Sequence, residues 1–234
     1  MSNNWIARGE KEIMAPSFDE AGFLEEINIQ EFIRSSGKDL DEYFVQAVLL
    51  GQVVQRILGR RGGIQLSRKP TFELKPVIEF MKRMRVSGLE KFDSATYISS
   101  INFYKNDEER HKHQAVGAIV IYFGEDYIVN ILKKLDYPVT DDDDSETLED
   151  ACGAFCNLVA GNFKSGLLQL GYPELVMSHF SSYRNEVLDG VEYGHEQRQK
   201  YEINFEIKGQ KSIVADLVMD KIHGFAADDG ERIG

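Results

Sequence analysis

Apolar residues recur at helical spacing in three parts of the chain. The first segment runs from residue 43 to 58 and is followed by Gly62 and Gly63. The second covers residues 125–136, and the third covers residues 145–171. Because apolar residues three or four positions apart share one face of an α-helix, the pattern predicts three amphipathic helices.

The spacing changes to two in five other segments, which are rich in Ile, Val, Tyr and Phe. Such alternation predicts strands. The segments are residues 95–104, 114–123, 174–187, 200–208 and 212–219. A charged turn at 106–113 separates the first two segments and predicts an antiparallel pair. Gly209-Gln210 predicts a tight turn between the last two segments. Residues 189–199 are predicted to form a polar loop.

Residues 77–85 follow two helix breakers, Pro70 and Pro76, and are predicted to form a short helix. One side of that helix would carry Lys82, Arg83 and Arg85, the compact basic group of an acidic protein. We interpret it as a solvated helix face in preference to a binding patch.

The order of these elements predicts an α+β fold with a largely antiparallel sheet and long helices packed on one of its faces. The chain has 234 residues, enough for one sizeable core. We expect a single domain over residues 41–222, an N-terminal arm over residues 1–40, and a frayed tail over residues 223–234.

Charge and hydropathy exclude several classes of partner. The chain has 39 acidic and 27 basic residues and a formal charge of -12, which argues against nucleic acid or an anionic membrane as the main partner. It has no run of 18 apolar residues, and its first residues lack the apolar core of a signal peptide. We therefore expect a cytoplasmic protein.

Common catalytic and metal-binding patterns are absent from the sequence. It contains no phosphate-binding glycine loop, no nucleophile elbow and no zinc-protease helix motif. The histidines are scattered, and Cys152 and Cys156 lie four residues apart near the apolar side of the predicted third helix. We interpret both cysteines as small core residues in preference to a metal or redox site.

The predicted helix over residues 145–171 has one side with little bulk. That side carries Asp150, Ala154, Asn157, Gly161 and Lys164. Small residues around a single carboxamide would let another backbone or side chain approach closely, so this side is typical of a docking surface. The alternative is that Asn157 satisfies a buried backbone group at a helix pair or a subunit contact.

The same residues resemble a known family. Asp150, Ala154 and Asn157, followed by Ala160-Gly161-Asn162, are similar to the signature helix of the CheC, CheX and FliY chemotaxis phosphatases, which reads [D/S]-x-x-x-E-x-x-N and often continues into A-G-N. The resemblance is closest to CheX, which has one such helix.

This resemblance implies a role for each matching residue. The helix would lie across the active site of a phosphorylated receiver domain, where Asn157 would orient a water for in-line attack and Asp150 would match the family's opening acidic residue. The receiver domain of a response regulator would be the partner and would bring its own magnesium, so no cofactor of this chain is expected. The family often pairs through sheet edges, so we also expect a homodimer.

Two positions depart from the family pattern. Ala154 stands where the family has Glu, and Phe180 stands where the family has Pro. A methyl group cannot accept a hydrogen bond from a lysine or any other cation. Two hypotheses therefore remain: a weak or divergent aspartyl-phosphate phosphatase in which Asp150, Glu149 or Lys164 makes a compensating contact, and a binding or scaffold module without turnover.

Overall fold

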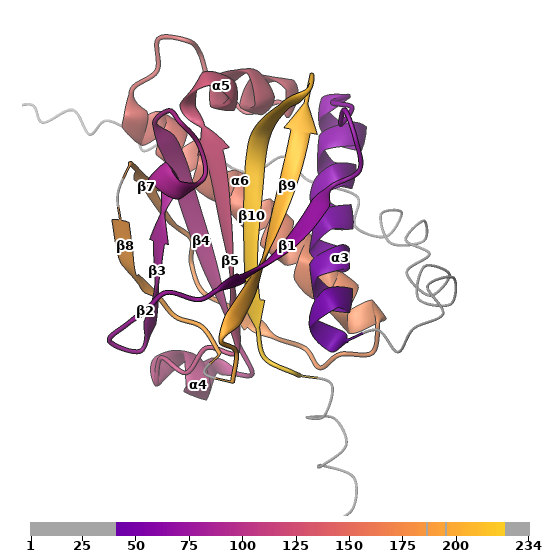
Figure 1. The fold of residues 1–234 in the computed structure, drawn as a ribbon, viewed down its shortest axis with the longest axis vertical. Coiled ribbons are helices and arrows are strands. Elements are labelled where there is room, and N and C mark those ends of the chain that lie inside the picture. The colour runs from indigo at the N-terminus through magenta and orange to yellow at the C-terminus, as the bar shows by residue number, and fades with distance from the viewer. Residues whose placement is uncertain (1–40, 186, 195, 223–234) are drawn as a thin grey trace, which may run out of the picture.

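Two antiparallel sheets form the centre of the structure. The structure is a computed structural model, and it describes residues 41–222 except residues 186 and 195. The seven-stranded sheet has the order β1-β9-β10-β5-β4-β6, with β7 also paired to β4 (Figure 1). Its strands are β1 (Thr71–Pro76), β4 (Thr96–Tyr104), β5 (Gly117–Gly124), β6 (Val176–Met177), β7 (Ser181–Arg184), β9 (Gln199–Ile207) and β10 (Gln210–Met219). The three-stranded sheet comprises β2 (Glu79–Phe80), β3 (Arg83–Ser87) and β8 (Val187–Val191).

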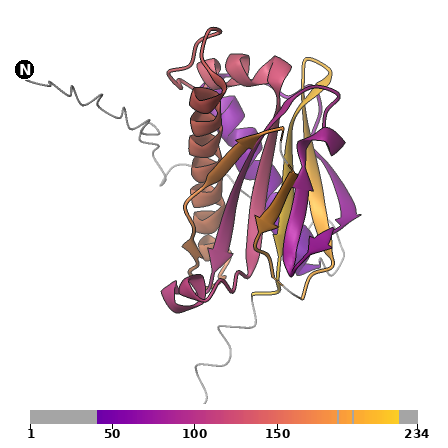
Figure 2. The same ribbon diagram turned by 90° about the vertical axis from the view of Figure 1, so that its left-hand side faces the viewer.

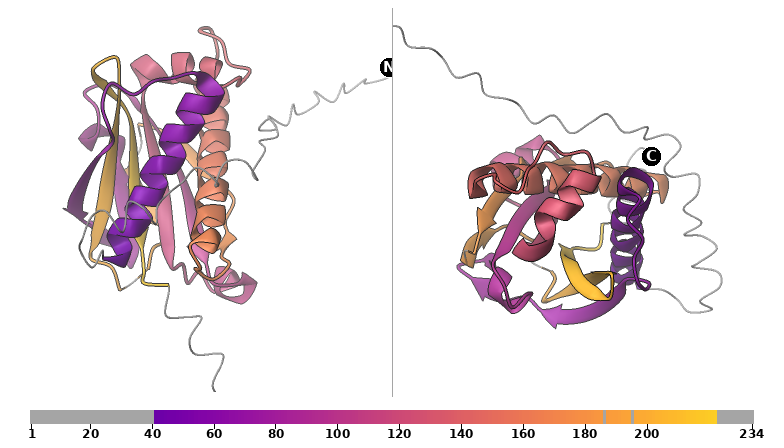
Figure 3. Two further views of the ribbon diagram at one scale, coloured as in Figure 1. Left: turned by 90° about the vertical axis from the view of Figure 1, so that its right-hand side faces the viewer. Right: turned by 90° about the horizontal axis from the view of Figure 1, so that it is seen from above.

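The long helices cover one face of the large sheet. Figures 2 and 3 show α3 and α6 side by side on that face, with the small sheet on the opposite side. The helical elements are α3 (Glu42–Arg56), the π-helical η1 (Ile57–Arg61), the 3-10 turn η2 (Gly88–Glu90), α4 (Asp107–His111), α5 (Glu125–Lys134) and α6 (Ser145–Gln169). None of the helices described is both long and apolar enough to span a lipid bilayer.

The middle strands of the large sheet, β4, β5 and β10, are buried on both faces. Along β5, Ile119 and Ile121 belong to the core beneath the helices, whereas Val120 and Tyr122 belong to a second core on the side of the small sheet. Since side chains alternate across a strand, both faces of β5 must be apolar, and all eight of its residues are buried. The α+β fold with an antiparallel sheet is therefore confirmed.

The predicted short helix over residues 77–85 is wrong. The chain forms β2 and β3 there, joined by Met81 and Lys82, which both have positive φ angles of 50° and 62°. In β3 only Met84 and Val86 are buried, both against the second core, so the true apolar period is two. The basic residues of this segment therefore do not form a helix face.

Other boundaries also differ from the prediction. The segment 174–187 is not one strand, because β6 and β7 pair with different parts of β4 and β8 then joins the small sheet. The polar loop expected from residue 189 therefore begins later, and the expected turn at 106–113 contains the short helix α4. Residues 1–40 and 223–234 lie outside the described residues, so the predicted arm and tail stay predictions.

The turn between β9 and β10 was predicted almost correctly. It is formed by Lys208 and Gly209, one residue earlier than Gly209-Gln210. Both residues have positive φ angles, 53° and 77°, as a two-residue hairpin turn that matches the twist of the strands requires.

Candidate functional site

The side of α6 with little bulk faces away from the sheet. Asp150 and Asn157 are exposed, and Gly161 and Lys164 are partly exposed. Ala154 lies on the same line but is only 7% exposed. The structure thus places the five residues predicted from the sequence along one helix; we call them the α6 stripe.

Contacts on the opposite side of α6 hold the stripe outward. The ring of Phe155 packs edge-on against Phe123 of β5 at 5.2 Å between centroids, and Phe163 packs against Phe103 of β4 at 5.7 Å. At the start of the helix, the Asp144 carboxylate accepts a hydrogen bond from the Thr147 backbone N–H at 2.9 Å. This capping contact lowers the pKa of Asp144.

The two asparagines of α6 have different environments. Asn162 is 4% exposed, and its Nδ2 donates a hydrogen bond to the Leu158 carbonyl at 2.8 Å. Asn157 is exposed, and no hydrogen bond found among residues of the described range involves its side chain. Within the described chain Asn157 does not satisfy a buried backbone group, so both polar atoms of its carboxamide can bind an external partner or a water.

Charged groups near the stripe are distributed unevenly along it. Lys164 Nζ lies 3.6 Å from the Glu174 carboxylate, so its charge is partly matched within the chain. Asp150 is exposed and makes no ion pair with another described residue. The stripe therefore offers an anionic group two helical turns before Asn157, and its cationic group at the other end is already partly paired.

Phe180 is a neighbour of the stripe that sequence reasoning did not identify as a contact. The loop between β6 and β7 brings it onto α6 at Gly153, where an added Cβ would lie 2.2 Å from two atoms of the Phe180 ring. Only glycine leaves room for this close approach. A glycine in the middle of a helix is unfavourable by about 1 kcal/mol relative to alanine. The presence of Gly153 in the predicted helix was therefore the sequence signal that another group approaches α6 here.

Within residues 41–222, the other reactive side chains that the structure describes lie apart from one another. No group of three or more potential metal ligands occurs among the described residues. Cys152 and Cys156 are buried and not disulfide-bonded, as expected for small core residues, and burial raises the pKa of the Cys156 thiol to about 12. His113 Nδ1 lies 2.8 Å from the carboxylate of Glu192, the residue that directly follows β8.

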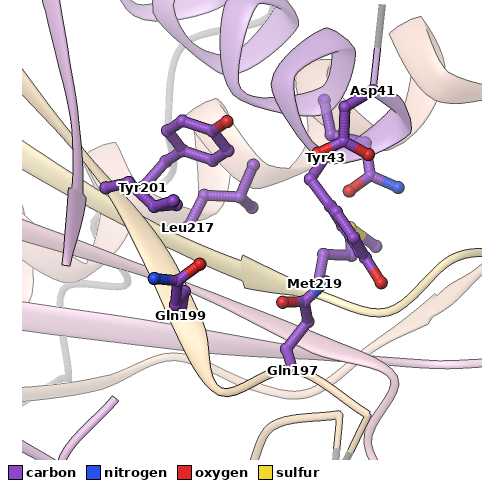
Figure 4. Close-up of a pocket in the computed structure, with 9 residues that line it drawn as sticks. Asp41, Tyr43, Gln197, Gln199, Tyr201, Leu217 and Met219 are labelled. Carbon is purple, nitrogen blue, oxygen red and sulfur yellow. The ribbon is translucent and has the colours of Figure 1, made fainter. Parts of the chain in front are cut away.

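A separate cavity of ≈180 Å³ lies between the start of α3 and strands β9 and β10 (Figure 4). The rings of Tyr43 and Tyr201 stand at its sides, and Leu217 and Met219 lie on β10 beneath them. Asp41 is the one charged residue among the described residues that line it. The cavity has neither a nucleophile nor an acid–base pair, so we do not assign chemistry to it.

Comparison with known proteins supports the fold. No family model and no curated protein matches the sequence. Among solved structures, a CheC-like superfamily protein from Shewanella sp. PV-4 is similar, with a TM-score of 0.50 and 16% identity, over 77% of this chain and 99% of that one.

Two further solved structures are similar to this chain. CheX from Desulfovibrio desulfuricans has a TM-score of 0.49 and 14% identity, over 75% of this chain and 99% of that one. The CheX–CheY–BeF3–Mg complex from Borrelia burgdorferi gives 0.42 and 14%, over 75% of this chain and 98% of the other. The chain has the fold of the CheC-like superfamily protein, as the sequence resemblance implied.

Proposed function

We propose that the protein binds phosphorylated receiver domains of response regulators through the α6 stripe and slowly hydrolyses their aspartyl phosphate. The observation that carries this proposal is the carboxamide of Asn157, which is exposed on α6 between Ala154 and Gly161 and bonds to no described residue. An added Cβ at Gly161 would meet no described atom within 4 Å apart from the neighbouring backbone of α6 itself, so among the described residues the surface beyond Asn157 is open to a partner.

A carboxamide suits this reaction. An acyl phosphate is already reactive, and the receiver supplies the magnesium that neutralises charge on the phosphoryl group. What remains is to hold a water in line with the phosphorus, which Asn157 can do by accepting one hydrogen bond and donating another. The chain therefore needs no general base and no cofactor of its own.

Ala154 sets the expected rate. In the family that the stripe resembles, a Glu stands here, and a methyl group cannot replace its contact with a cation. Losing a charged group from a phosphoryl-transfer site costs on the order of 3 kcal/mol of transition-state stabilisation, or about 10²-fold in rate. We therefore expect slow turnover.

Ala154 also supports a second candidate, a non-catalytic scaffold that recognises the phosphorylated receiver and protects it or competes for it. In that case Asn157 would contact the partner without activating water. Both candidates use the same surface, and they differ in whether the phosphate is removed.

Binding is tested by titrating the full chain with receiver domains from its own host, each with and without beryllofluoride and Mg²⁺. The proposal predicts that at least one receiver binds more tightly when it carries beryllofluoride, and that Gly161→Trp, which fills the open part of the stripe, abolishes that binding. If no receiver binds to the wild-type protein in either state, the proposed function is wrong.

We also propose that the protein forms a homodimer through the outer edge of β1. This strand ends the main sheet, and its Leu74 side chain is 51% exposed. No other strand among the described residues pairs with its outer edge, and an edge of this kind can pair with a second copy. Light scattering on the wild type and on Leu74→Lys should give a dimer and a monomer, respectively; a wild-type monomer would overturn this assignment.

A further inference from the structure

The Phe180 ring rests directly on the backbone of α6. An added Cβ at Gly153 would lie 2.2 Å from Phe180 Cδ2 and Cε2, and 2.7 Å from Ser182 Oγ. Ser182 is itself fixed, because its hydroxyl donates a hydrogen bond to Ser99 Oγ at 3.1 Å. The ring therefore has a rigid support, although Phe180 belongs to a loop and its side chain is 38% exposed.

Asn157 lies one helical turn beyond Gly153, the residue that this ring covers. Side chains of an α-helix lean toward its N-terminus, so the Asn157 side chain covers the turn that contains Gly153 and Ala154. Phe180 packs on that same turn. The exposed part of an aromatic ring thus shares one surface of α6 with a carboxamide that bonds to no described residue.

The surface has a composition that fits one kind of partner. Its apolar part is Phe180 with Ala154, and its charged part is Asp150, an acid one turn further toward the start of α6 that has no ion-pair partner among the described residues. A complementary partner presents an apolar side chain beside a cationic centre. A receiver domain that holds Mg²⁺ at its phosphorylation site has such a cationic centre.

We propose that Phe180 is the apolar anchor by which the receiver domain is held on α6, and that Gly153 is glycine so that the ring can lie there. This inference rests on the proposed function. Where the family pattern has a charged group at position 154, this chain has a methyl group, and the adjacent ring supplies contact area in its place. Because the ring is already immobilised, it loses little conformational freedom on binding.

The anchor should affect affinity and not the chemical step. Truncation of a central aromatic contact commonly weakens binding by 10-fold or more. We therefore expect Phe180→Ala to raise the Kd for a receiver carrying beryllofluoride and Mg²⁺ by about 10- to 30-fold. The rate of phosphate loss at saturating protein should stay within about twofold, because Asn157 is untouched.

Three further variants separate the anchor from a general loss of structure. Gly153→Ala should displace the ring and raise the Kd as Phe180→Ala does, whereas Phe180→Leu should recover part of the affinity. Ile78→Ala removes a side chain that is 47% exposed on the opposite side of the sheet and should leave the Kd unchanged. The circular dichroism and melting temperature of each variant identify any that fail to fold.

The outcomes distinguish this inference from the proposed function. If the wild type binds a receiver and Phe180→Ala binds it with equal affinity, the anchor is wrong and the proposed function stands. If Gly153→Ala keeps full affinity while Phe180→Ala loses it, the role assigned to glycine is wrong. If the wild type binds no receiver, both fail together.

Discussion

Asn157 and Asn162 are two asparagines on one helix with opposite consequences for folding. The Asn162 amide is buried and bonded to the Leu158 carbonyl, while the Asn157 amide is exposed and has no partner in the described structure. Residue identity alone does not separate them, because A-G-N and the earlier asparagine both belong to the motif. The buried Asn162 therefore contributes to stability, whereas the exposed Asn157 is available to a partner.

This difference predicts opposite effects of substitution to alanine. Asn162→Ala should lower the free energy of unfolding by about 1–2 kcal/mol, because it removes a buried hydrogen bond and packed atoms. Asn157→Ala should change it by less than about 0.5 kcal/mol. Urea denaturation of the two variants checks this; a large loss of stability in Asn157→Ala would mean that its side chain has a structural role.

Replacing Ala154 by the Glu of the family pattern should increase the phosphatase activity. Ala154→Glu places a carboxylate next to Asn157 that can contact a cation of the receiver, so the rate of dephosphorylation should rise by about 10²-fold. The rate is measured at saturating protein, with Ala154→Gln as the uncharged control. Equal rates for the Glu and Gln variants would show that charge at this position is not what limits turnover.

At the scale of elements, the helices could be predicted from the sequence and the small sheet could not. The long helix α6 has a continuous apolar side, a capping aspartate and Gly171 after its end, all of which are local signals. By contrast, β3 is only five residues long and alternates arginines with buried residues. The alternation is too short to distinguish a strand from a helix, and one of its two pairing partners, β8, lies about 100 positions later in the chain.

Strands β9 and β10 also carry a buried network of charges that the sequence did not reveal. Asp216 is 0% exposed, and its carboxylate accepts hydrogen bonds from Lys91 at 3.0 Å, Lys200 at 2.6 Å and Tyr122 at 2.8 Å. Lys91 also bonds to Glu202. Burial acts to raise the pKa of Glu202, but the hydrogen bonds and charges of Lys75 and Lys91 outweigh burial and lower it.

Removing the centre of this network should strongly destabilise the fold. Asp216→Ala leaves Lys200 and part of Lys91 without a counter-charge in a buried place, so we expect a loss of about 3–5 kcal/mol in the free energy of unfolding. Glu108→Ala breaks an exposed ion pair with Lys112 on α4 and should cost less than about 1 kcal/mol. Similar losses for both variants in urea denaturation would contradict this account.

At the scale of the whole molecule, the end of β10 couples pH to stability. Asp220 is 8% exposed, and a Cβ at Gly194 would collide with its carboxyl group. Burial, with a contribution from the charge of Glu196, raises the pKa of Asp220 to about 6. The folded protein therefore holds this proton more tightly than the unfolded chain, in which the pKa of aspartate is about 3.9.

The sign of the effect follows from that difference. The stabilisation from protonated Asp220 is complete below pH of about 4 and is lost as the pH rises through about 6. Between pH 4 and pH 8, the free energy of unfolding of the wild type should fall by on the order of 2 kcal/mol relative to Asp220→Asn. A constant difference between the two proteins over this range would exclude Asp220 as the titrating group.

Only part of the candidate site could be predicted from the sequence, because helical spacing shows which residues share one helix face but does not show contacts between distant segments. The α6 stripe lies on one helix, so helical periodicity placed its five residues together. Phe180 reaches Gly153 through the pairing of β6 and β7 with β4, which is a long-range feature. Sequence spacing could show that residue 153 needs little volume, but it could not show which side chain occupies the space.

The central claim is that Asn157 acts on the phosphate of a bound receiver. It is tested most directly by the lifetime of a phosphorylated receiver, measured alone, with saturating wild-type protein, and with saturating Asn157→Ala. We predict that the wild type shortens the lifetime and that Asn157→Ala, although still bound, returns it to the value of the receiver alone. Equal lifetimes with the wild type and with Asn157→Ala would contradict the account.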